Sequence, residues 1–481
     1  MRHSLGTVAL SSGGITGLSQ LIYWLQLVEH ELLLFAAFWF IVGTIDELVV
    51  DFAWLWLRIT GRAGAPQLAR GIEQRPLSGR AAVLVAAWRE ADVIAEMIAH
   101  SCKAWSQQGL RIYVGCYRND PATLAAAIAG AGADARVRLV VHDRQGPTTK
   151  ADCLNRLYAA LCADEARSGI AFRTVVLQDA EDMVHPAALT VIDRALDEAE
   201  FIQLPVWPVP QPASPWVAGH YTDEFTEAHT KSMVVRDALG AAIPAAGVGC
   251  GFSRAALAAV ARERSGHGAA APFAPDSLTE DYELGLLIGR TGGRSRFLRV
   301  RDADGELVAT RAFFPASLDE SVRQKTRWIH GIALQGWERL GWAGRPIDIW
   351  MALRDRRGPL TAIVLAAAYS LLVIEAVLAV ASVAGWNETA VVSPLLRFML
   401  EFSFASFVWR AVWRFGFTAW EYGIVEGIRA ILRIPVANVI AIMAGRRALK
   451  AYVRSLSGAE VSWDKTRHRN HPATSAATAS A

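Results

Sequence analysis

The chain has few cysteines and few charged residues for its length. Its 481 residues include five Cys and are 20 % charged against 53 % hydrophobic. No Cys-x-x-Cys pair occurs, so the spacing predicts no zinc site, and the odd number argues against a closed disulfide framework. We therefore expect reduced thiols in a cytoplasmic compartment at Cys102, Cys116, Cys153, Cys162 and Cys250.

Three further signals are missing. The net charge is only +3, which gives no overall field for binding a nucleic acid, and no nucleic-acid partner is expected. Residues 1–20 lack the basic start and small-residue cleavage site of a signal peptide. The segment before Lys150 does not have the glycine spacing of a Walker A loop. These absences argue against three classes of protein: nucleic-acid-binding proteins, secreted proteins with a cleaved signal peptide, and P-loop NTPases.

Long apolar runs are present instead, with 17 Trp residues that favour membrane interfaces. Residues 32–50, 360–384 and 394–415 are each predicted to cross a bilayer. Charged side chains interrupt the third run and are expected to face protein or water. Arginines cluster only after the first run, so the positive-inside rule puts the chain from about residue 58 in the cytoplasm.

The segment 425–452 has a different pattern. Its apolar core, residues 434–444, is short and contains Pro435, and basic residues stand on both sides of it. This pattern predicts a helix pair lying on the cytoplasmic face of the membrane. Three crossings are therefore expected, and four is the alternative if this segment also spans.

Between the apolar parts, strand and helix patterns alternate. Such alternation predicts an α/β domain with a mainly parallel sheet covered on both faces. The expected strands are 81–87, 111–116, 137–141 and 174–177, with helices at 91–106, 121–131 and 149–164. The chain divides into a transmembrane segment (1–60), the α/β domain (61–345), transmembrane and interfacial helices (346–456) and a tail (457–481).

Three carboxylates follow the strand at 174–177. Asp179 and Glu181 are separated by one residue, so in extended backbone they share a face and can hold one divalent cation, with Asp182 adjacent. Oxygen ligands of this kind suit Mg²⁺ or Mn²⁺, with phosphate oxygens completing the shell. The other interpretation is a solvated acidic turn that caps the helix starting near Pro186.

Polar residues after the other strands are expected at the same sheet edge. Glu90 follows the first strand and Asp120 the second, where open α/β sheets bind nucleotides. Lys150 stands at the start of a helix, where it is either a phosphate contact or an ordinary surface lysine.

Two motifs stand further along the chain. Thr279 is expected to cap a helix that carries Glu280 and Asp281. Gln324, Arg327 and Trp328 have i, i+3, i+4 spacing on a helix predicted to run to Trp337, so they share one face. An amide and an indole can hold a sugar, and a guanidinium can neutralise a diphosphate.

These four elements, in this order, resemble the family 2 glycosyltransferases of the GT-A fold, which include cellulose and hyaluronan synthases. The resemblance covers about residues 80–340. A closer one, over nearly the whole chain, is to the phage-adsorption protein B type of bacterial inner-membrane glycosyltransferase. It rests on residues 146–155, 179–182, 323–328 and 463–466. That type often has a further C-terminal nucleotide-sensing domain, which we do not expect after the tail here. Glu181 stands where many family members have Asp.

The resemblance implies a Rossmann-like GT-A domain in the cytoplasm, with transmembrane helices on both sides, in the bacterial inner membrane. It implies an inverting transfer of sugar from a nucleotide-diphosphate donor, such as a UDP-sugar, to a growing polysaccharide or lipid-linked acceptor. The metal would be held by Asp179 and Glu181. Asp281 would be the base, with Glu280 orienting its neighbours. Donor and acceptor would be bound by Glu90, Asp120, Lys150, Asp182, Gln324, Arg327 and Trp328.

An export partner in the envelope is a further expectation of this resemblance. Two alternatives remain at this point. One is a non-catalytic membrane receptor or secretion scaffold that keeps the fold. The other is a single sugar transfer to a lipid phosphate.

Overall fold

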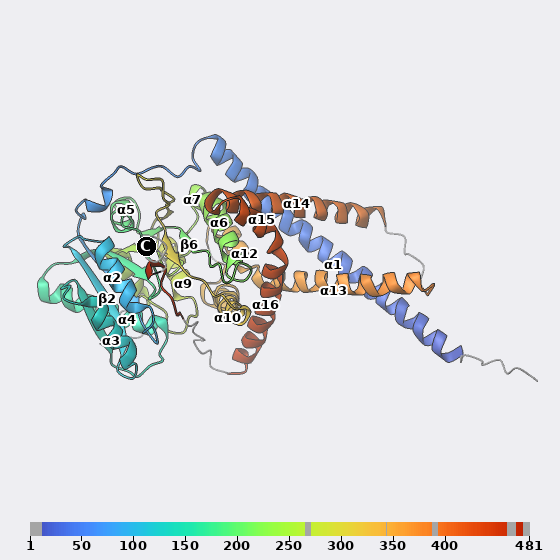
Figure 1. Cartoon of the computed structure of the whole chain (residues 1–481), viewed down its shortest axis with the longest axis horizontal. Coiled ribbons are helices and arrows are strands. Elements are labelled where there is room, and N and C mark those ends of the chain that lie inside the picture. The colour runs from blue at the N-terminus through green and yellow to red at the C-terminus, as the bar shows by residue number, and fades with distance from the viewer. Residues whose placement is uncertain (1–11, 265–270, 343, 387–392, 459–467, 475–481) are drawn as a thin grey trace, which may run out of the picture. The chain divides into compact units, whose positions relative to one another are not determined.

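The computed structural model describes residues 12–264, 271–342, 344–386, 393–458 and 468–474 (Figure 1). The chain forms two compact units. The first, called the helical unit here, comprises residues 1–49 and 360–412, and the second, called the α/β unit, comprises residues 50–359 and 413–481. The motif at 463–466, which carried part of the resemblance, lies outside the described residues.

A seven-stranded mixed sheet forms the centre of the α/β unit. Strands β3, β2, β1 and β4 are parallel neighbours, and β7 runs antiparallel between β4 and β5. The prediction of a mainly parallel sheet is confirmed for the first four strands, and all four were located. In spatial order the strands are β3 (Val137–His142), β2 (Leu110–Tyr117), β1 (Arg80–Ala86), β4 (Phe172–Gln178), β7 (Cys250–Ser253), β5 (Phe201–Gln203) and β8 (Ser295–Phe297).

Helices cover both faces of this sheet. Successive side chains of a strand point to opposite faces, so Val83 and Val85 of β1 pack in one core and Ala82 and Leu84 in the other. The first core is completed by α2 (Ile94–Ala104), α3 (Pro121–Ala131) and α5 (Ala188–Ala195). The second is completed by α4 (Lys150–Ser168), α8 (Arg254–Arg264) and α9 (Glu280–Arg290).

The order of the strands determines where a ligand can bind. From β1 the chain proceeds to β2 and then β3 on one side, and it returns to place β4 on the other side of β1. Connections therefore leave β1 and β4 in opposite directions, which opens a crevice at their carboxyl ends. Glu90 follows β1 and Asp179 follows β4, so both lie at this crevice.

Short strands and helices of the α/β unit form one side of the crevice. A two-stranded parallel sheet pairs β6 (Val206–Pro208) with β9 (Thr310–Ala312). The helix of Gln324, Arg327 and Trp328 reaches Trp337, as predicted, but not as one regular α-helix. After α10 (Leu318–Trp328) comes a π-helical segment, Ile329–Gln335, and then a short α-helix that contains Trp337. The other helices are α6 (Gly219–Glu227), a π-helical turn (Ala228–Ser232), α7 (Met233–Ala238), α11 (Gly336–Leu340) and α12 (Pro346–Arg356).

Two C-terminal helices pack onto this unit. Helix α15 (Ile424–Leu432) and α16 (Ile434–Leu456) meet at a bend of 50° at Arg433. The Arg433 guanidinium is buried, donates to Asp223 Oδ1 (2.7 Å) and the Pro215 carbonyl (2.7 Å), and pairs with Glu426. Ile440 and Ala444 of α16 pack against Val322 of α10. The predicted helix pair is therefore anchored to the α/β unit at its bend.

The helical unit contains long apolar helices. Helix α1 (Ser12–Ile59) and α13 (Gly358–Val383) are long and apolar enough to cross a membrane. Helix α14 (Pro394–Tyr422), which contains the predicted third crossing, is not among the helices that are both long and apolar enough to cross a membrane. The pair α15–α16 would count as a third span only as one bent segment. The number of crossings stays a prediction.

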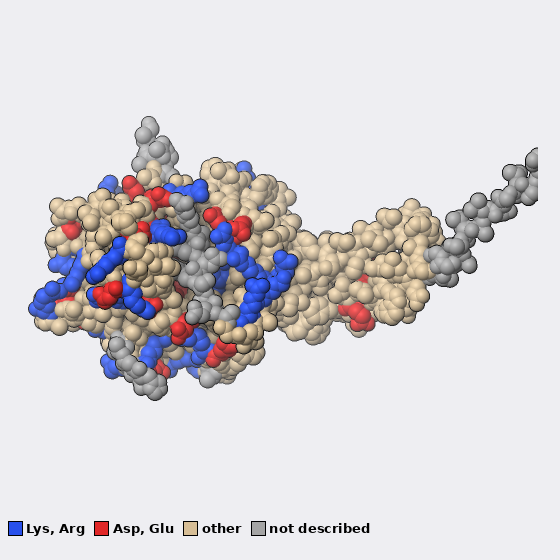
Figure 2. Space-filling model, turned by 90° about the horizontal axis from the view of Figure 1, so that it is seen from below, with Lys and Arg blue, Asp and Glu red and all other residues tan. Residues whose placement is uncertain are grey.

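The two units differ in surface charge. Figure 2 shows few charged side chains on the helical unit, whereas positively and negatively charged side chains are intermixed on the α/β unit.

We expect Arg433→Met to lower the free energy of unfolding by about 3–5 kcal/mol, because it leaves buried Asp223 without its cation. Burial already raises the pKa of Asp223 to about 7, although Arg433 opposes the shift. The folded variant would hold a proton there that the unfolded chain releases, so its deficit should widen as pH rises above 7. Denaturant unfolding of purified protein at several pH values measures both effects.

The matched control is Arg429→Met, whose side chain is 44 % exposed and pairs with Glu426. It should cost less than about 1 kcal/mol. Equal midpoints for the two variants would contradict the anchoring role of Arg433.

Candidate active site

A cavity of about 810 Å³ opens at the carboxyl ends of β1 and β4. Its wall brings together most of the residues that the sequence singled out. They are Glu90, Lys150, Asp179, Glu181, Asp182, Glu280, Asp281, Gln324, Arg327 and Trp328. Segments far apart in the sequence thus converge on one site of the α/β unit.

The acidic turn after β4 is held by its own carboxylate. Asp182 is 1 % exposed, and its Oδ2 accepts a hydrogen bond from the Asp179 amide (2.8 Å). Burial, with the nearby charges of Asp179 and Glu181, raises the pKa of Asp182 well above its usual range. Helix α5 begins later, with Ala187 as its N-cap and no side-chain cap. The helix-cap interpretation of the acidic triplet is therefore wrong.

Lys150 lies among these carboxylates. Its Nζ is 2.6 Å from Asp179 Oδ1, and its side chain is 18 % exposed, so it is not an ordinary surface lysine. Helix α4 presents it through a capping box formed by Thr149 and Asp152. Burial lowers the pKa of Lys150, but the charges of Asp179, Glu280 and Asp281 outweigh burial and raise it. The ammonium is thus charged at neutral pH.

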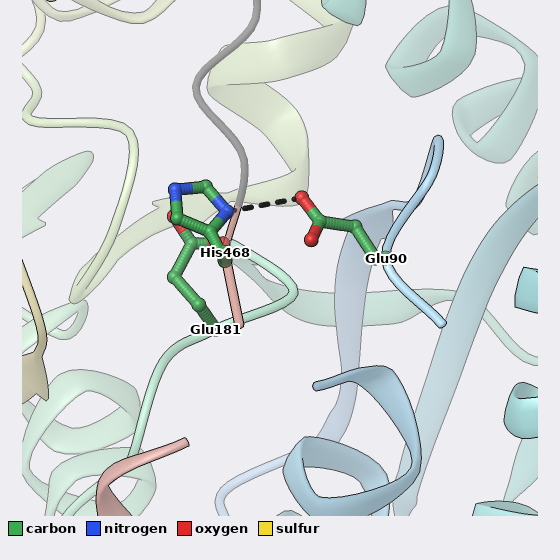
Figure 3. A group of neighbouring side chains, drawn as sticks. All are labelled: Glu90, Glu181 and His468. Atoms are coloured by element: carbon green, nitrogen blue, oxygen red, sulfur yellow. Dashed lines mark hydrogen bonds and ion pairs between the residues drawn. The ribbon is translucent and has the colours of Figure 1, made fainter. Parts of the chain in front are cut away.

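Glu90 and Glu181 meet at a histidine that sequence reasoning missed. His468 Nδ1 is 3.2 Å from Glu90 Oε1, and His468 Nε2 is 3.2 Å from Glu181 Oε1. Figure 3 shows the imidazole beside both carboxylates. One ligand atom from each of the three residues lies within 4.8 Å of the others, a spacing that can hold a metal ion. No spacing pattern in the sequence pointed to His468; only the motif at 463–466 lies near it.

A second histidine fixes this part of the tail. His471 is buried, and its Nε2 donates to the Asp182 carbonyl (3.0 Å). The same residue whose carboxylate shapes the acidic turn therefore also anchors the segment 468–474. This contact explains how a residue so distant in sequence reaches Glu90 and Glu181.

The donor set fits the divalent cation that the acidic residues led us to expect. The two carboxylates are oxygen ligands that suit Mn²⁺ or Mg²⁺, with water and phosphate oxygens completing the shell, and the imidazole adds one nitrogen ligand. Glu181 belongs to this group, whereas Asp179 forms an ion pair with Lys150. Asp179 as a metal ligand stays a prediction.

Glu280 and Asp281 open helix α9. Thr279 is the N-cap residue, as predicted, but its side chain makes no capping hydrogen bond among the described residues. Burial, followed by the charge of Asp281, raises the pKa of Glu280 to about 7. Burial also raises the pKa of Asp281, with Lys150 opposing the shift. Both carboxyls are therefore more basic than free ones.

Gly247 approaches Asp281 closely. Its φ is +78°, and a Cβ atom there would overlap Asp281 Oδ2 and lie 3.3 Å from Lys150 Nζ. Buried Gln203 holds the neighbouring backbone, accepting from the Ala246 amide (2.9 Å) and donating to the Val248 carbonyl (2.9 Å). Only glycine fits this position. The sequence offered no signal for it.

Helix α10 presents the other motif to the cavity. Arg327 is close enough to lower the pKa of Asp281 by its charge. The Trp328 ring packs edge-on to Tyr221, with centroids 6.2 Å apart. The Gln324 Oε1 is buried and has no hydrogen-bond partner in the part of the chain that the structure describes, so it is available to a ligand hydroxyl.

Asp120 is the one predicted site residue outside the cavity wall. Its Oδ2 accepts from the Arg89 amide (2.6 Å), and its Oδ1 accepts from the Thr123 amide (3.4 Å) at the start of α3. It thereby holds the backbone just before Glu90. The structure gives Asp120 a positioning contact, and its direct contact with a nucleoside stays a prediction.

A model of the family described as glycosyltransferase like family 2 matches residues 79–331. Two curated relatives are bacteriophage adsorption protein B of Escherichia coli K12 and bacteriophage N4 adsorption protein B of Escherichia coli O157:H7. Each is 31 % identical over 471 residues, which cover 92 % of this chain and 62 % of the relative. The chain thus spans less than two thirds of the length of these relatives.

Solved structures also align with the chain. One is the mannosyltransferase PcManGT from Pyrobaculum calidifontis in complex with GDP-Man and Mn²⁺, with 17 % identity, a TM-score of 0.48, and coverage of 83 % of this chain and 98 % of that one. Another is glucosyl-3-phosphoglycerate synthase from Mycobacterium tuberculosis with Mn²⁺, UDP and phosphoglyceric acid. Its identity is 20 % and its TM-score 0.31, with coverage of 50 % of this chain and 73 % of that one.

We expect His468→Gln to weaken Mn²⁺ binding about tenfold or more, since even residues that only orient metal ligands contribute about 10- to 100-fold to metal affinity. Titration calorimetry of the purified protein with Mn²⁺ measures the loss. Glu263→Gln, an exposed carboxylate on α8, is the control and should bind as the unsubstituted protein does. Unchanged Mn²⁺ affinity in His468→Gln would exclude the tail from the metal site.

Proposed function

Because the chain belongs to the glycosyltransferase-like family 2, whose model covers residues 79–331, we propose that it is a membrane-bound inverting glycosyltransferase. It moves a sugar from a nucleotide-diphosphate donor, such as a UDP-sugar, to a growing polysaccharide or a lipid-linked acceptor. The acceptor oxygen bonds to the anomeric carbon as the bond to the diphosphate oxygen breaks.

One observation supports this proposal most strongly. A carboxylate with a raised pKa, Asp281, shares a cavity with two cations, Lys150 and Arg327. A base must accept the hydroxyl proton at neutral pH, and cations must stabilise the charge that develops on the departing diphosphate. This pairing of roles is what sugar transfer from a nucleotide diphosphate requires.

A divalent cation fits the same cavity. Glu181, Glu90 and His468 would hold it, together with Asp179, which would then give up part of its contact with Lys150. When bound, such an ion neutralises the diphosphate as a Lewis acid. Asp182 has a positioning role, because its carboxylate holds the Asp179 amide.

The chain's own residues would share the remaining work. Asp281 accepts the proton of the attacking hydroxyl. Burial raises the pKa of this carboxyl, and the charge of Lys150 opposes the rise. Glu280, with a pKa near 7, is partly protonated and orients its neighbours. The Gln324 amide and Trp328 ring bind sugar, while Arg327 contacts the diphosphate.

We place the enzyme in the bacterial inner membrane with the α/β unit in the cytoplasm. Two apolar helices, α1 and α13, have the length to cross the bilayer. Arginines follow α1, as the positive-inside rule requires of a cytoplasmic segment. Polymer extension with an export partner in the envelope is the favoured outcome, and single transfer to a lipid phosphate is the alternative.

Incubation of membranes with a panel of radiolabelled nucleotide sugars, with and without Mn²⁺, tests the proposal. Label should pass into a larger or lipid-extractable product with one donor of the panel. Asp281→Asn should reduce turnover by about 10²- to 10⁴-fold because the proton acceptor is lost. Donor affinity should change little, since the loss is confined to the transition state.

Glu280→Gln is the neighbouring control and should cost less turnover. Equal small losses in both variants would place the base elsewhere. If the unsubstituted protein neither binds nor uses any nucleotide sugar, the receptor or scaffold alternative is correct.

Gly247→Ala should reduce turnover strongly, because its methyl group would displace Asp281. Gly240→Ala is matched for backbone strain, with φ at +64°, but nothing lies within 4 Å of the added Cβ. Each variant should lose about 1 kcal/mol of stability from positive φ, and only Gly247→Ala should lose activity. Parallel unfolding and turnover measurements separate the two effects, and equal activity would contradict the close approach.

A further inference from the structure

A second cavity, of about 340 Å³, lies in the α/β unit between α9, α12 and the segment after α11. Its wall includes Arg236, Arg290, Arg345 and Arg356, with Asp348. Two of these guanidiniums have carboxylate partners. Arg236 binds Asp355 through two hydrogen bonds (2.8 and 2.9 Å), and Arg345 binds Asp348 (2.7 and 3.1 Å).

Arg356 is different. The residue is 7 % exposed, its Nη1 donates to the Gly341 carbonyl (2.7 Å), and its guanidinium lies 4.6 Å from the centre of the Trp342 ring. Its Nε and Nη2 are buried, and among the described residues they have no hydrogen-bond partner. Within the described part of the chain, Arg356 forms no ion pair. Buried donors of a charged group are costly when left unsatisfied.

Arg290, an exposed residue, also lines this cavity. It donates to the Leu340 carbonyl, and burial, followed by the positive charge of Arg356, lowers its pKa. Two guanidiniums in one cavity repel each other in the absence of an anion. This arrangement has the character of a binding site rather than of a packing contact.

We propose that this cavity binds a small phosphate-bearing molecule through Arg290 and Arg356. The planar guanidinium fork matches phosphate oxygens, and the two orphaned donors of Arg356 supply such contacts. The cavity volume is at the lower end of the range for small-molecule sites. The phosphate belongs either to a soluble phosphate ester or to a phospholipid headgroup.

Contacts lead from this cavity to the active site. Asp355, the partner of Arg236, also lines the larger cavity and accepts a hydrogen bond from the Tyr282 hydroxyl (3.0 Å). Tyr282 follows Asp281 on α9. A ligand in this cavity would therefore be separated by a single side chain, Arg236, from the Asp355–Tyr282 contact beside Asp281.

Calorimetric titration of the full-length protein with pyrophosphate, in the presence of a chelator, tests the proposal independently of any transfer activity. Arg356→Gln and the exposed Arg290→Gln should each weaken binding about tenfold or more, because a hydrogen bond to a charged group is lost. Arg327→Gln reports on binding in the larger cavity, and Arg167→Gln, on the exposed side of α4, is the charge-matched control.

Binding that is lost in Arg290→Gln and Arg356→Gln but kept in Arg327→Gln supports the proposal and assigns a soluble phosphate. If pyrophosphate fails but vesicles of anionic phospholipid bind with the same dependence on Arg290, the ligand is a headgroup. Binding that depends on Arg327 alone, or equal binding in all four variants, overturns the proposal. Absence of binding to both probes also overturns it. Arg290→Gln alone decides the question if Arg356→Gln does not fold.

Discussion

The active site depends on the ion pair between Lys150 and Asp179. The cavity at the carboxyl ends of β1 and β4 is lined by Glu90, Asp179, Glu181, Asp182, Glu280 and Asp281. That many carboxylates in one partly buried space would otherwise take up protons, because each charge disfavours the others. The ammonium of Lys150, placed at the start of α4, opposes this, and its own pKa rises in return. Lys150 thus allows the proposed base and the proposed cation site to coexist.

A second dependence runs through the C-terminal part of the chain. Arg433 ties the bend between α15 and α16 to Asp223, and α16 packs on α10, which carries Gln324, Arg327 and Trp328. Further on, His471 binds the Asp182 carbonyl and brings His468 to Glu90 and Glu181. Residues that follow the apolar helices in sequence therefore complete the wall of a cavity whose other residues follow β1 and β4. Loss of the tail would remove His468, one of the three candidate metal ligands, from the site.

The site also shows how carboxylates of similar sequence surroundings acquire different roles. Asp182 gives its oxygen to a backbone amide and shapes the turn, whereas Glu181, its neighbour, points to Glu90 and His468. Glu280 and Asp281 differ in the same way, because Lys150 lowers the pKa of both but Gly247 lies against Asp281 alone. The role of each carboxylate therefore follows from the groups that its oxygen atoms contact.

The sequence by itself determined the α/β alternation, the first four strands, the two long apolar helices and ten of the residues that line the cavity. Those features are local or periodic. Runs of β-branched residues, the spacing of apolar residues and acidic residues at a strand end can each be recognised from residues that are close together in the sequence. The tertiary structure alone decided that β7 runs antiparallel, that Asp120 holds backbone outside the cavity, and that His468 and Gly247 reach the site. A long-range contact leaves no periodic trace in the chain, because its partners are independent in sequence and meet only when the sheet order and the packed helices bring them together.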